Sequence, residues 1–389
     1  MAISSIDIDI FLKAVNDRSN ISGYTHDFYN YPARFSPLFA REAIKTFTNP
    51  GDLVIDPFMG GGTTLVEANL SERHAIGFDI SSLAYFISKV KTTPLSSADI
   101  FFIKKWADKT IKKLSCRIVG HRPEKWIDKG YQRNLSNRST WAVRKLMEQF
   151  INEIESSGLT LKIEHFLRCA LLKTGQWALD STKEIPSAEQ FRNKLSEIIN
   201  QMGTSAEEYS NIVKKHKNKI NIIPINKSSV EIRRLKRLKQ FNPPKLVLTS
   251  PPYPGIHVVY HRWQIHGRRE TPAPFWIANN LDGQGLTHYT MGSRNQKGLT
   301  NYFQNIEDTF RAIVKVCDSE TLIVQMLAFS EPEWQLPRYL EAMTAAGLQE
   351  ELVDTSRIWR EVPNRKWYAQ KQGNTPSSKE VVLFHILIR

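Results

Sequence analysis

The sequence predicts an α/β fold with a mostly parallel sheet and an inserted helical region. Short apolar runs alternate with helical patterns over the first hundred residues, as they do in α/β folds. Between about residues 97 and 216 the pattern is mainly helical, and strand patterns return after it. We therefore divide the chain into residues 1–96 and 217–389, which form the two halves of one α/β domain, and residues 97–216, which form an inserted helical subdomain.

Two strands are predicted in the first half. The apolar run from Asp52 to Asp56 follows a turn signal and ends in a glycine-rich turn, after which a helical pattern runs from Thr63 to about Leu70. The second strand covers His74 to Phe78, and Ser81 or Ser82 can cap the helix after it. This alternation of strand and helix is the one that builds a parallel sheet.

Helical periodicity identifies the insertion. Leu146, Phe150 and Ile154 recur every fourth residue, which predicts an amphipathic helix. Ser187, followed by Gln190 and an apolar run, predicts a capping box at the start of another helix. No strand pattern interrupts these helices, so we expect a purely helical insertion.

The strand pattern returns in the second half. We expect strands at Ile220 to Ile225, where Pro224 restricts the end, and at Leu246 to Leu248. Apolar runs at 322–326 and 381–387 predict two further strands near the C-terminus. These strands would complete the sheet begun in the first half.

Charge is abundant and unevenly distributed. The 389 residues include 53 Lys and Arg against 39 Asp and Glu, a net charge of +14. Residues 101–240 hold 29 of these basic side chains against 14 acidic ones, so the positive excess lies between the two halves of the α/β domain. Such an excess favours a polyanionic partner, because each neutralised phosphate releases counterions. The alternative is that long helices carry solvated lysines.

Composition excludes several classes of protein. Cys116, Cys169 and Cys317 are far apart and form no CxxC pair, which argues against a disulfide scaffold or a structural zinc site. The N-terminus does not resemble a secretory signal, and no apolar run approaches the roughly 20 residues that span a bilayer. We expect a soluble protein of the cytoplasm with no bound metal.

The first motif that carries chemistry is Asp-Pro-Phe-Met-Gly-Gly-Gly-Thr-Thr at residues 56–64. Its glycines allow a sharp turn and a close approach to a ligand, and the helix after it offers unpaired N–H groups. Asp56 can receive an ammonium group, and Asp79 at the end of the next strand is placed to bind ribose hydroxyls. No Gly-Lys-Ser/Thr sequence follows, so a loop for nucleoside triphosphates is not expected.

The second motif is Thr-Ser-Pro-Pro-Tyr at residues 249–253, directly after a predicted strand. Two prolines remove two backbone donors and make this stretch rigid. It then presents a hydroxyl, carbonyls and an aromatic ring, which suit an exocyclic amino group of a nucleic-acid base. Ser250 Oγ and the Pro251 carbonyl can accept hydrogen bonds from the amine, and Tyr253 can stack on a base turned out of the duplex.

Together the two motifs resemble the DNA amino-methyltransferase family, which makes N4-methylcytosine and N6-methyladenine. The segment Tyr-Pro-Ala-Arg-Phe-Ser-Pro at 31–37 is similar to the family's additional cofactor motif. The resemblance implies a Rossmann-like fold that binds S-adenosyl-L-methionine, with base flipping before methyl transfer. The implied cofactor-binding residues are Tyr31, Pro32, Phe35, Asp56, Phe58, Gly60, Gly62, Thr63 and Asp79. The implied catalytic residues are Ser250, Pro251, Pro252 and Tyr253.

Three departures from the family pattern bear on the target. Ser250 stands where adenine-specific members usually have Asp or Asn, and the Ser form resembles the N4-cytosine type. Asn226 and the residues after it replace an acidic residue that contacts adenine in many relatives. About 120 residues separate the two motif-bearing halves, which resembles members whose target-recognition region lies between them.

The sequence therefore predicts a cytosine-N4 DNA methyltransferase, acting as the modification component of a restriction-modification system whose endonuclease would be a separate chain. The double-stranded DNA substrate would contact the inserted helical subdomain and a set of basic residues, some of which lie near aromatic residues in the sequence. The predicted nucleic-acid contacts are Arg233, Arg234, Lys236, Arg237, His261, Arg262 and Arg268. Three alternatives stay open: an N6-adenine DNA methyltransferase, an RNA guanine-N2 methyltransferase, and a non-catalytic nucleic-acid-binding protein.

Overall fold

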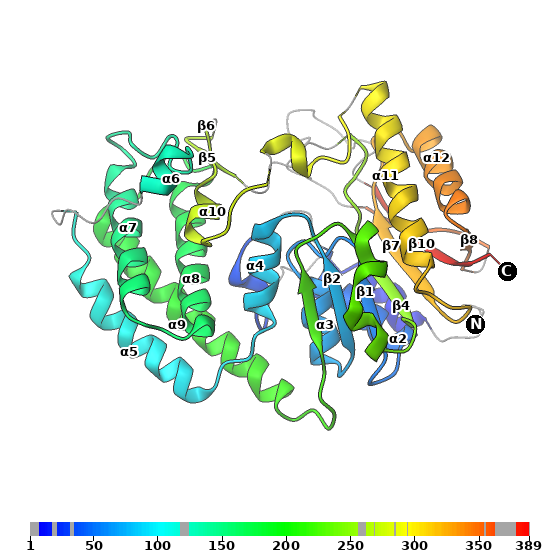
Figure 1. The fold of residues 1–389 in the computed structure, drawn as a ribbon, viewed down its shortest axis with the longest axis horizontal. Coiled ribbons are helices and arrows are strands. Elements are labelled where there is room, and N and C mark those ends of the chain that lie inside the picture. The colour runs from blue at the N-terminus through cyan, green and yellow to red at the C-terminus, as the bar shows by residue number, and fades with distance from the viewer. Residues whose placement is uncertain are drawn as a thin grey trace.

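The computed structural model describes residues 8–17, 22–31, 35–116, 124–255, 262–267, 269–283, 285–293, 295–353, 355–361 and 379–388. An α/β region and a helical region lie next to each other, on the right and on the left of Figure 1. Pro32, His261 and Arg268, which the sequence assigned to the site, lie outside the described residues. No helix among the described residues has the length and apolar character needed to cross a membrane.

The sheet of the α/β region has the strand order β3-β2-β1-β4-β7-β10-β8, and β9 also pairs with β10. The strands are β1 (Leu53–Asp56), β2 (His74–Phe78), β3 (Ile222–Ile225), β4 (Leu246–Thr249), β7 (Leu322–Leu327), β8 (Leu348–Glu351), β9 (Ile358–Glu361) and β10 (Lys379–Leu387). The first five strands in this order are parallel, and β10 is antiparallel to its neighbours. This is a Rossmann-like sheet, as predicted, and its order reverses between β1 and β4.

Both faces of the sheet are covered, which explains the apolar runs of its strands. Along β1, Leu53 and Ile55 belong to one core and Val54 to another, because successive side chains of a strand point to opposite faces. One core packs against α1 (Asp9–Val15), α2 (Pro37–Phe47) and α3 (Thr63–Leu70). The other packs against α11 (Gln296–Val314) and α12 (Pro332–Ala345).

Local predictions in this region are confirmed in detail. The Ser81 side chain caps α4 (Ser82–Lys91) by accepting a hydrogen bond from the Ala84 N–H. Pro224 lies in β3, which among the described strands pairs only with β2, at the edge of the sheet, where a missing backbone donor is tolerated. Short 3-10 helices follow β3, and these are η3 (Ser229–Arg234) and η4 (Lys236–Gln240).

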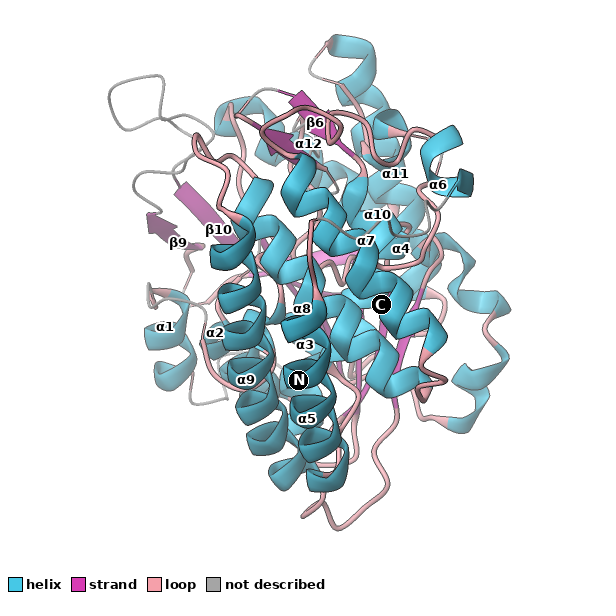
Figure 2. Cartoon of the chain, turned by 90° about the vertical axis from the view of Figure 1, so that its left-hand side faces the viewer, coloured by secondary structure: helices cyan, strands magenta, loops and turns pink. Residues whose placement is uncertain are grey.

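The helical region, on the side that faces the viewer in Figure 2, is built on a third core. It contains α5 (Ser97–Lys113), α6 (Glu124–Asp128), α7 (Trp141–Ser156), α8 (Leu161–Leu179) and α9 (Ala188–Val213). The predicted stripe Leu146, Phe150 and Ile154 is buried on α7. Ser187 and Gln190 form the predicted capping box at the start of α9.

A second segment of the chain joins this helical region. It comprises β5 (Trp263–Ile265), β6 (Arg269–Thr271) and α10 (Ala273–Ile277). The indole of Trp263 packs over Gly175 of α8, where an added Cβ would lie 2.5 Å from the ring. Trp263 Nε1 also donates a hydrogen bond to Tyr29 Oη at 3.1 Å. The helical region therefore includes part of the 217–389 segment in addition to residues 97–216.

Candidate active site

A cavity of about 880 Å³ lies at the carboxyl ends of the central strands. This is the place where the strand order reverses, and parallel sheets bind their ligands there. Its walls come from both predicted motifs, from η3, from η5 (Leu286–Tyr289) and the residues after it, and from α11. The fold thus brings together two motifs that are far apart in the sequence.

The glycine-rich turn forms one wall. Gly60 and Gly62 both have positive φ angles, of 47° and 77°, which favour glycine. At Gly62 an added Cβ would also lie 2.7 Å from Ser88 Oγ, so this position has no room for a side chain. The ring of Tyr31 packs on Gly60, with its Cε1 atom 3.2 Å from where a Cβ would lie. Tyr31 and the turn therefore form a single wall of the cavity.

Asp79 stands where the sequence predicted it, at the end of β2 on the cavity wall. Its Oδ2 accepts the Gly60 N–H at 3.0 Å and its Oδ1 accepts the Ser81 N–H at 2.8 Å. Removal from bulk water raises the pKa of this carboxyl to about 6, against the two backbone hydrogen bonds, which lower it. The exposed apolar side chain of Ile80 lies beside it on the wall. An acid next to an apolar surface suits a nucleoside.

Asp56 has a structural use that the sequence did not reveal. Its Oδ1 accepts the Phe58 N–H at 3.1 Å and the Thr249 hydroxyl at 2.7 Å, and its Oδ2 accepts the Thr64 hydroxyl at 2.7 Å. These bonds join the two motifs across 193 residues. Burial raises the pKa of Asp56 to about 6. A carboxylate has about four lone-pair sites, so roughly one remains for a ligand.

Ser250 connects two spaces. It lines the large cavity and also a small adjoining cavity of about 30 Å³. The small cavity is lined by Phe35, Asp56, Phe58, Met59, Gly60, Gly61, Thr63 and Ser250. Within the described part of the chain, no hydrogen bond occupies the Ser250 hydroxyl. The serine is therefore available to a ligand that reaches from one space into the other.

The rest of the second motif lies on the wall of the large cavity. Pro251, Pro252 and Tyr253 all line it. The Tyr253 hydroxyl donates a hydrogen bond to Glu380 Oε1 at 2.7 Å, so the ring is held at its far end. Its remaining surface is half-buried against the core under α11. A ring fixed in this way can offer a flat surface to a planar ligand.

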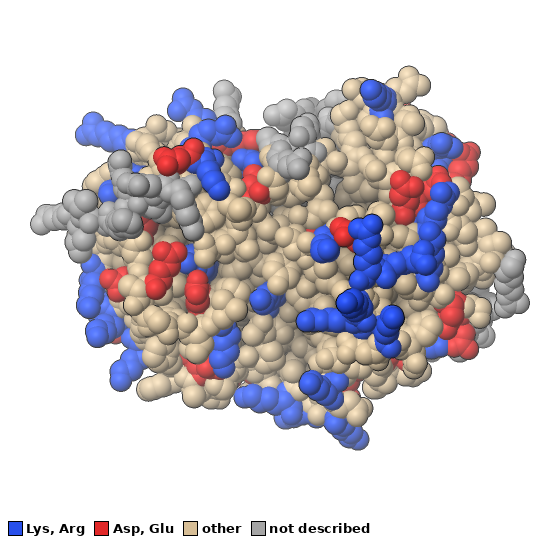
Figure 3. All heavy atoms as spheres, in the orientation of Figure 1, with Lys and Arg blue, Asp and Glu red and all other residues tan. Residues whose placement is uncertain are grey.

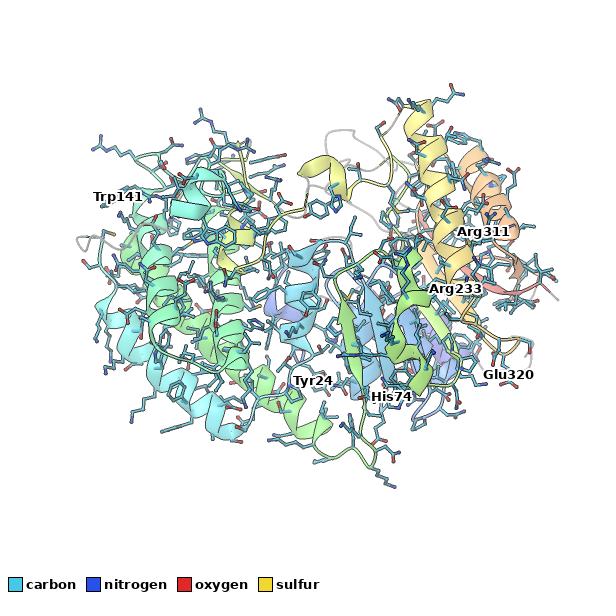
Figure 4. All side chains as sticks on the ribbon, viewed as in Figure 1. Tyr24, His74, Trp141, Arg233, Arg311 and Glu320 are labelled. Atoms are coloured by element: carbon cyan, nitrogen blue, oxygen red, sulfur yellow. The ribbon has the colours of Figure 1, made fainter. Side chains whose placement is uncertain are left out.

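Basic side chains surround the mouth of the cavity. Arg233 and Arg234 of η3 line it and are exposed, and Lys236 and Arg237 continue the exposed series on η4. Figure 3 shows Lys and Arg gathered over this part of the α/β region. α11 supplies basic residues that the sequence analysis missed, since Arg311 lies with Arg233 on the cavity wall (Figure 4).

Lys315, four residues after Arg311, also lines the cavity. Their spacing on an amphipathic helix was the available signal, because residues four apart share a helix face. The neighbouring carboxylate of Asp308 lies on the same wall, and Arg311 pairs with Glu307. The rim is thus mixed but mainly positive.

One predicted contact must be corrected. Arg262 is buried, and its guanidinium forms an ion pair with Asp282. Its charge is therefore neutralised inside the protein, and it does not belong to the exposed basic rim. The arginine is needed where it is, because a buried carboxylate requires a charged partner.

A metal site is not apparent in the described residues. Among them, no group of three or more His, Cys, Asp or Glu side chains has the arrangement of a metal site.

Comparisons with known proteins identify related sequences. Residues 8–89 match the family model described as DNA methylase. The type II methyltransferase M.MjaII of Methanocaldococcus jannaschii is 34% identical over 100 residues, which cover 26% of this chain and 18% of that protein. M.MvaI of Kocuria varians, also a type II methyltransferase, is 34% identical over 104 residues, covering 24% and 23%. The orphan methyltransferase M.BamHII of Bacillus amyloliquefaciens is 45% identical over 53 residues, covering 14% and 20%. The chain thus spans less than a quarter of the length of each of these relatives.

Solved structures resemble the chain only distantly. TrmN from Thermus thermophilus aligns with a TM-score of 0.34 and 10% identity, over 93% of this chain and 52% of that one. The rRNA methyltransferase aviRa from Streptomyces viridochromogenes aligns with a TM-score of 0.34 and 11% identity, over 99% and 95%.

Proposed function

We propose that this chain, whose residues 8–89 belong to the DNA amino-methyltransferase family, transfers a methyl group to N4 of cytosine in double-stranded DNA. The cofactor of this family is S-adenosyl-L-methionine, which supplies a methyl group activated by a positively charged sulfur. The observation that carries the proposal is that Ser250 lines both the cavity bearing Asp79 and the small cavity under the glycine-rich turn. A methyl donor and a methyl acceptor could meet there.

The residues of the glycine-rich wall fit this cofactor. Asp79 would accept hydrogen bonds from the ribose hydroxyls, and Ile80 offers an apolar surface for the adenine ring. The remaining lone pair of Asp56 would meet the ammonium of the amino-acid end. Gly60 and Gly62 have no side chains of their own, and Tyr31 and Ser88 pack against them, so the backbone of the turn itself can approach the ligand.

Residues 249–253, the proposed catalytic loop, would prepare the amino group of the base for methyl transfer. An amino group attached to a base is a weak nucleophile, because its lone pair is delocalised into the ring. Acceptors at Ser250 Oγ and the Pro251 carbonyl would hold both N–H groups and leave the lone pair directed at the methyl group. Tyr253 would stack on the flipped base, and one proton would leave the nitrogen to solvent. Most of the rate enhancement would then come from orientation.

Two observations favour cytosine as the target. The residue at the catalytic position is Ser250, as in the N4-cytosine type. At the position where many relatives carry an acid toward adenine, the side-chain amide of Asn226 donates a hydrogen bond to the Asp79 carbonyl at 3.0 Å. This amide is therefore used to join the ends of β2 and β3.

The basic rim would hold the DNA backbone. Arg233 and Lys236 form no ion pair with the described residues, so both charges are available to phosphates. Arg311 of α11 and Lys315, directly after this helix, line the same cavity. The helical region would lie along the same DNA and recognise its sequence, as the modification component of a restriction-modification system requires.

A nucleoside analysis tests this function. Purified protein would be incubated with methyl-labelled S-adenosylmethionine and either unmethylated genomic DNA or total RNA, followed by digestion and mass spectrometry. We expect labelled N4-methylcytosine from DNA, and far less of it from a matched reaction with the Ser250→Ala variant. Labelled N6-methyladenine would correct the target base, and label on RNA alone would replace DNA as the substrate. Absence of label from both DNA and RNA would favour a nucleic-acid-binding protein without methyltransferase activity.

A further inference from the structure

The far end of the Tyr253 ring is attached to the strand β10. The Tyr253 hydroxyl donates to Glu380 Oε1 at 2.7 Å. Glu380 lies near the start of β10 and is only 4% exposed. An unpaired carboxylate is costly at such a depth, so a second group must balance its charge.

Arg360 supplies that second group. Its Nε donates to Glu380 Oε2 at 2.5 Å, and the two residues are directly paired in the antiparallel register of β9 and β10. The same guanidinium donates through Nη1 to the Val15 carbonyl at the end of α1, at 3.1 Å. Each oxygen of Glu380 thus has a partner, and the carboxylate is held from two sides.

We propose that Glu380, held by Arg360, is a positioning residue for Tyr253, and that it fixes the tyrosine ring in the orientation that receives the target base. This inference rests on the proposed function, because it assigns the stacking role to Tyr253. Two prolines fix the backbone before the ring, and the hydrogen bond to Glu380 fixes its opposite end.

This arrangement also explains why residue 253 is a tyrosine. Its hydroxyl binds Glu380, and the residue also lines the cavity proposed for the base. A hydrogen bond to a carboxylate is about twice as strong as one between neutral groups, so it is suited to holding a mobile side chain. A phenylalanine would keep the stacking surface but lose the attachment.

A double-mutant cycle tests the attachment. Glu380→Gln keeps the size and one acceptor oxygen but removes the charge that pairs with Arg360. We expect it to lower the single-turnover rate of methyl transfer roughly tenfold, the scale of one charge-assisted hydrogen bond. Tyr253→Phe should cause a similar loss, and the double variant should lose no more than either single variant. The dissociation constant of S-adenosylmethionine should not change.

A matched control lies on the same hairpin. Glu361→Gln makes the same chemical change at an exposed residue of β9, next to Arg360, and should leave the rate unaltered. Multiplicative losses in the double variant would mean that Glu380 acts independently of Tyr253, and this would overturn the proposal. Full activity of Tyr253→Phe would also overturn it.

A spectroscopic measurement separates this inference from the proposed function. With 3-fluorotyrosine incorporated at position 253, the fluorine resonance should move on Glu380→Gln and stay in place on Glu361→Gln. This measurement needs no substrate. A protein that methylates no nucleic acid would contradict the proposed function while the fluorine shift still reports the attachment. An unmoved resonance in both variants would show that the attachment is absent.

Discussion

The α/β region and the helical region each have a buried apolar core, yet their polar groups are used differently. In the helical region buried charges neutralise one another, as Arg144 Nη1 and Glu148 Oε1 do at 2.5 Å. In the α/β region Asp79 and Ser250 face the cavity. Among the described residues, those lining that cavity all lie outside 97–216. The cavity proposed for the chemistry is thus built by segments outside residues 97–216, and the surface of the inserted helices remains for the proposed recognition of DNA.

The largest expected effect comes from a substitution in the proposed catalytic loop, which tests whether the chemistry depends on this part of the α/β region. Ser250→Ala should lower the single-turnover rate of methyl transfer about a hundredfold, the scale for losing one oriented hydrogen-bonding group in a catalytic site. S-adenosylmethionine should still bind, as equilibrium dialysis can measure. The control is Ser229→Ala, another serine on the cavity wall. Equal losses in both variants would show that the serine at 250 has no special role.

A change inside the helical region should leave the chemistry intact. Arg168 is 1% exposed and donates to Glu155, Glu164 and the carbonyl of Ile277. Arg168→Met should lower the free energy of unfolding by about 2 kcal/mol, because the buried carbonyl loses its donor.

Urea denaturation measures this loss of stability. Lys112→Met breaks an exposed pair on α5 and should change the stability by less than about 1 kcal/mol. Altered binding of S-adenosylmethionine by the Arg168 variant would break the comparison, since it would couple the helical region to the cofactor site.

The carboxylate at the end of β2 should matter for the cofactor. Asp79→Asn should raise the dissociation constant of S-adenosylmethionine at least about tenfold, since hydrogen bonds to a charged acceptor are worth about 1.5–3 kcal/mol. Isothermal titration calorimetry provides the measurement. Asp308→Asn alters another acid on the same cavity wall and should have little effect. A larger increase of the dissociation constant for Asp308→Asn than for Asp79→Asn would place the nucleoside of the cofactor beside α11.

Acid should weaken cofactor binding. The pKa values of Asp56 and Asp79 are both raised from 3.8 to about 6. As the pH falls from 7 to 5, both become protonated in the folded protein and lose the charge that attracts an ammonium or a hydroxyl. We expect affinity to fall by up to about tenfold for each carboxylate that loses its charge.

The stability of the fold should change in the opposite direction. Because the folded protein takes up these protons before the unfolded chain does, both groups favour folding most fully below pH 3.8 and lose this contribution as the pH rises through 6.

Asp79→Asn should flatten the pH dependence of cofactor affinity. An unchanged pH profile would show that Asp79 is not the titrating group.

The smallest effect concerns the basic rim. Arg233→Gln and Lys315→Gln should each reduce the slope of log affinity for DNA against log salt by about 0.9 if one phosphate contact is lost. Lys45→Gln lies on α2, which covers the opposite face of the sheet, and should leave the slope unchanged. Equal slopes in all three variants would show that the basic side chains of this rim contact water and not DNA phosphates.

Much of the local structure in both regions could be predicted from the sequence. The strand at Leu53–Asp56, the glycine-rich turn and the caps at Ser81 and Ser187 depend on residues close together in the chain. Turn and cap chemistry acts over a few residues, so the pattern contains the information. The side chains expected at the end of β2 and in the catalytic loop accordingly reach the cavity.

Other features depend on contacts between distant segments. The burial of Arg262 with Asp282 and the joining of Trp263 to the helical core were not predictable, because no periodic pattern marks which distant segment covers a residue. Arg311 and Lys315 were missed although their helical spacing was visible in the sequence, because their position beside η3 follows only from packing.

By itself the sequence determined the Rossmann-like α/β fold, the two motifs and their local structure. Only the tertiary structure decided how the motifs meet, through the hydrogen bond from Thr249 to Asp56 across 193 residues, and how Tyr253 is held, through Glu380. The physical reason is that a hydrogen bond between distant residues depends on the register and packing of the whole sheet, whereas a turn or a cap depends on its immediate neighbours.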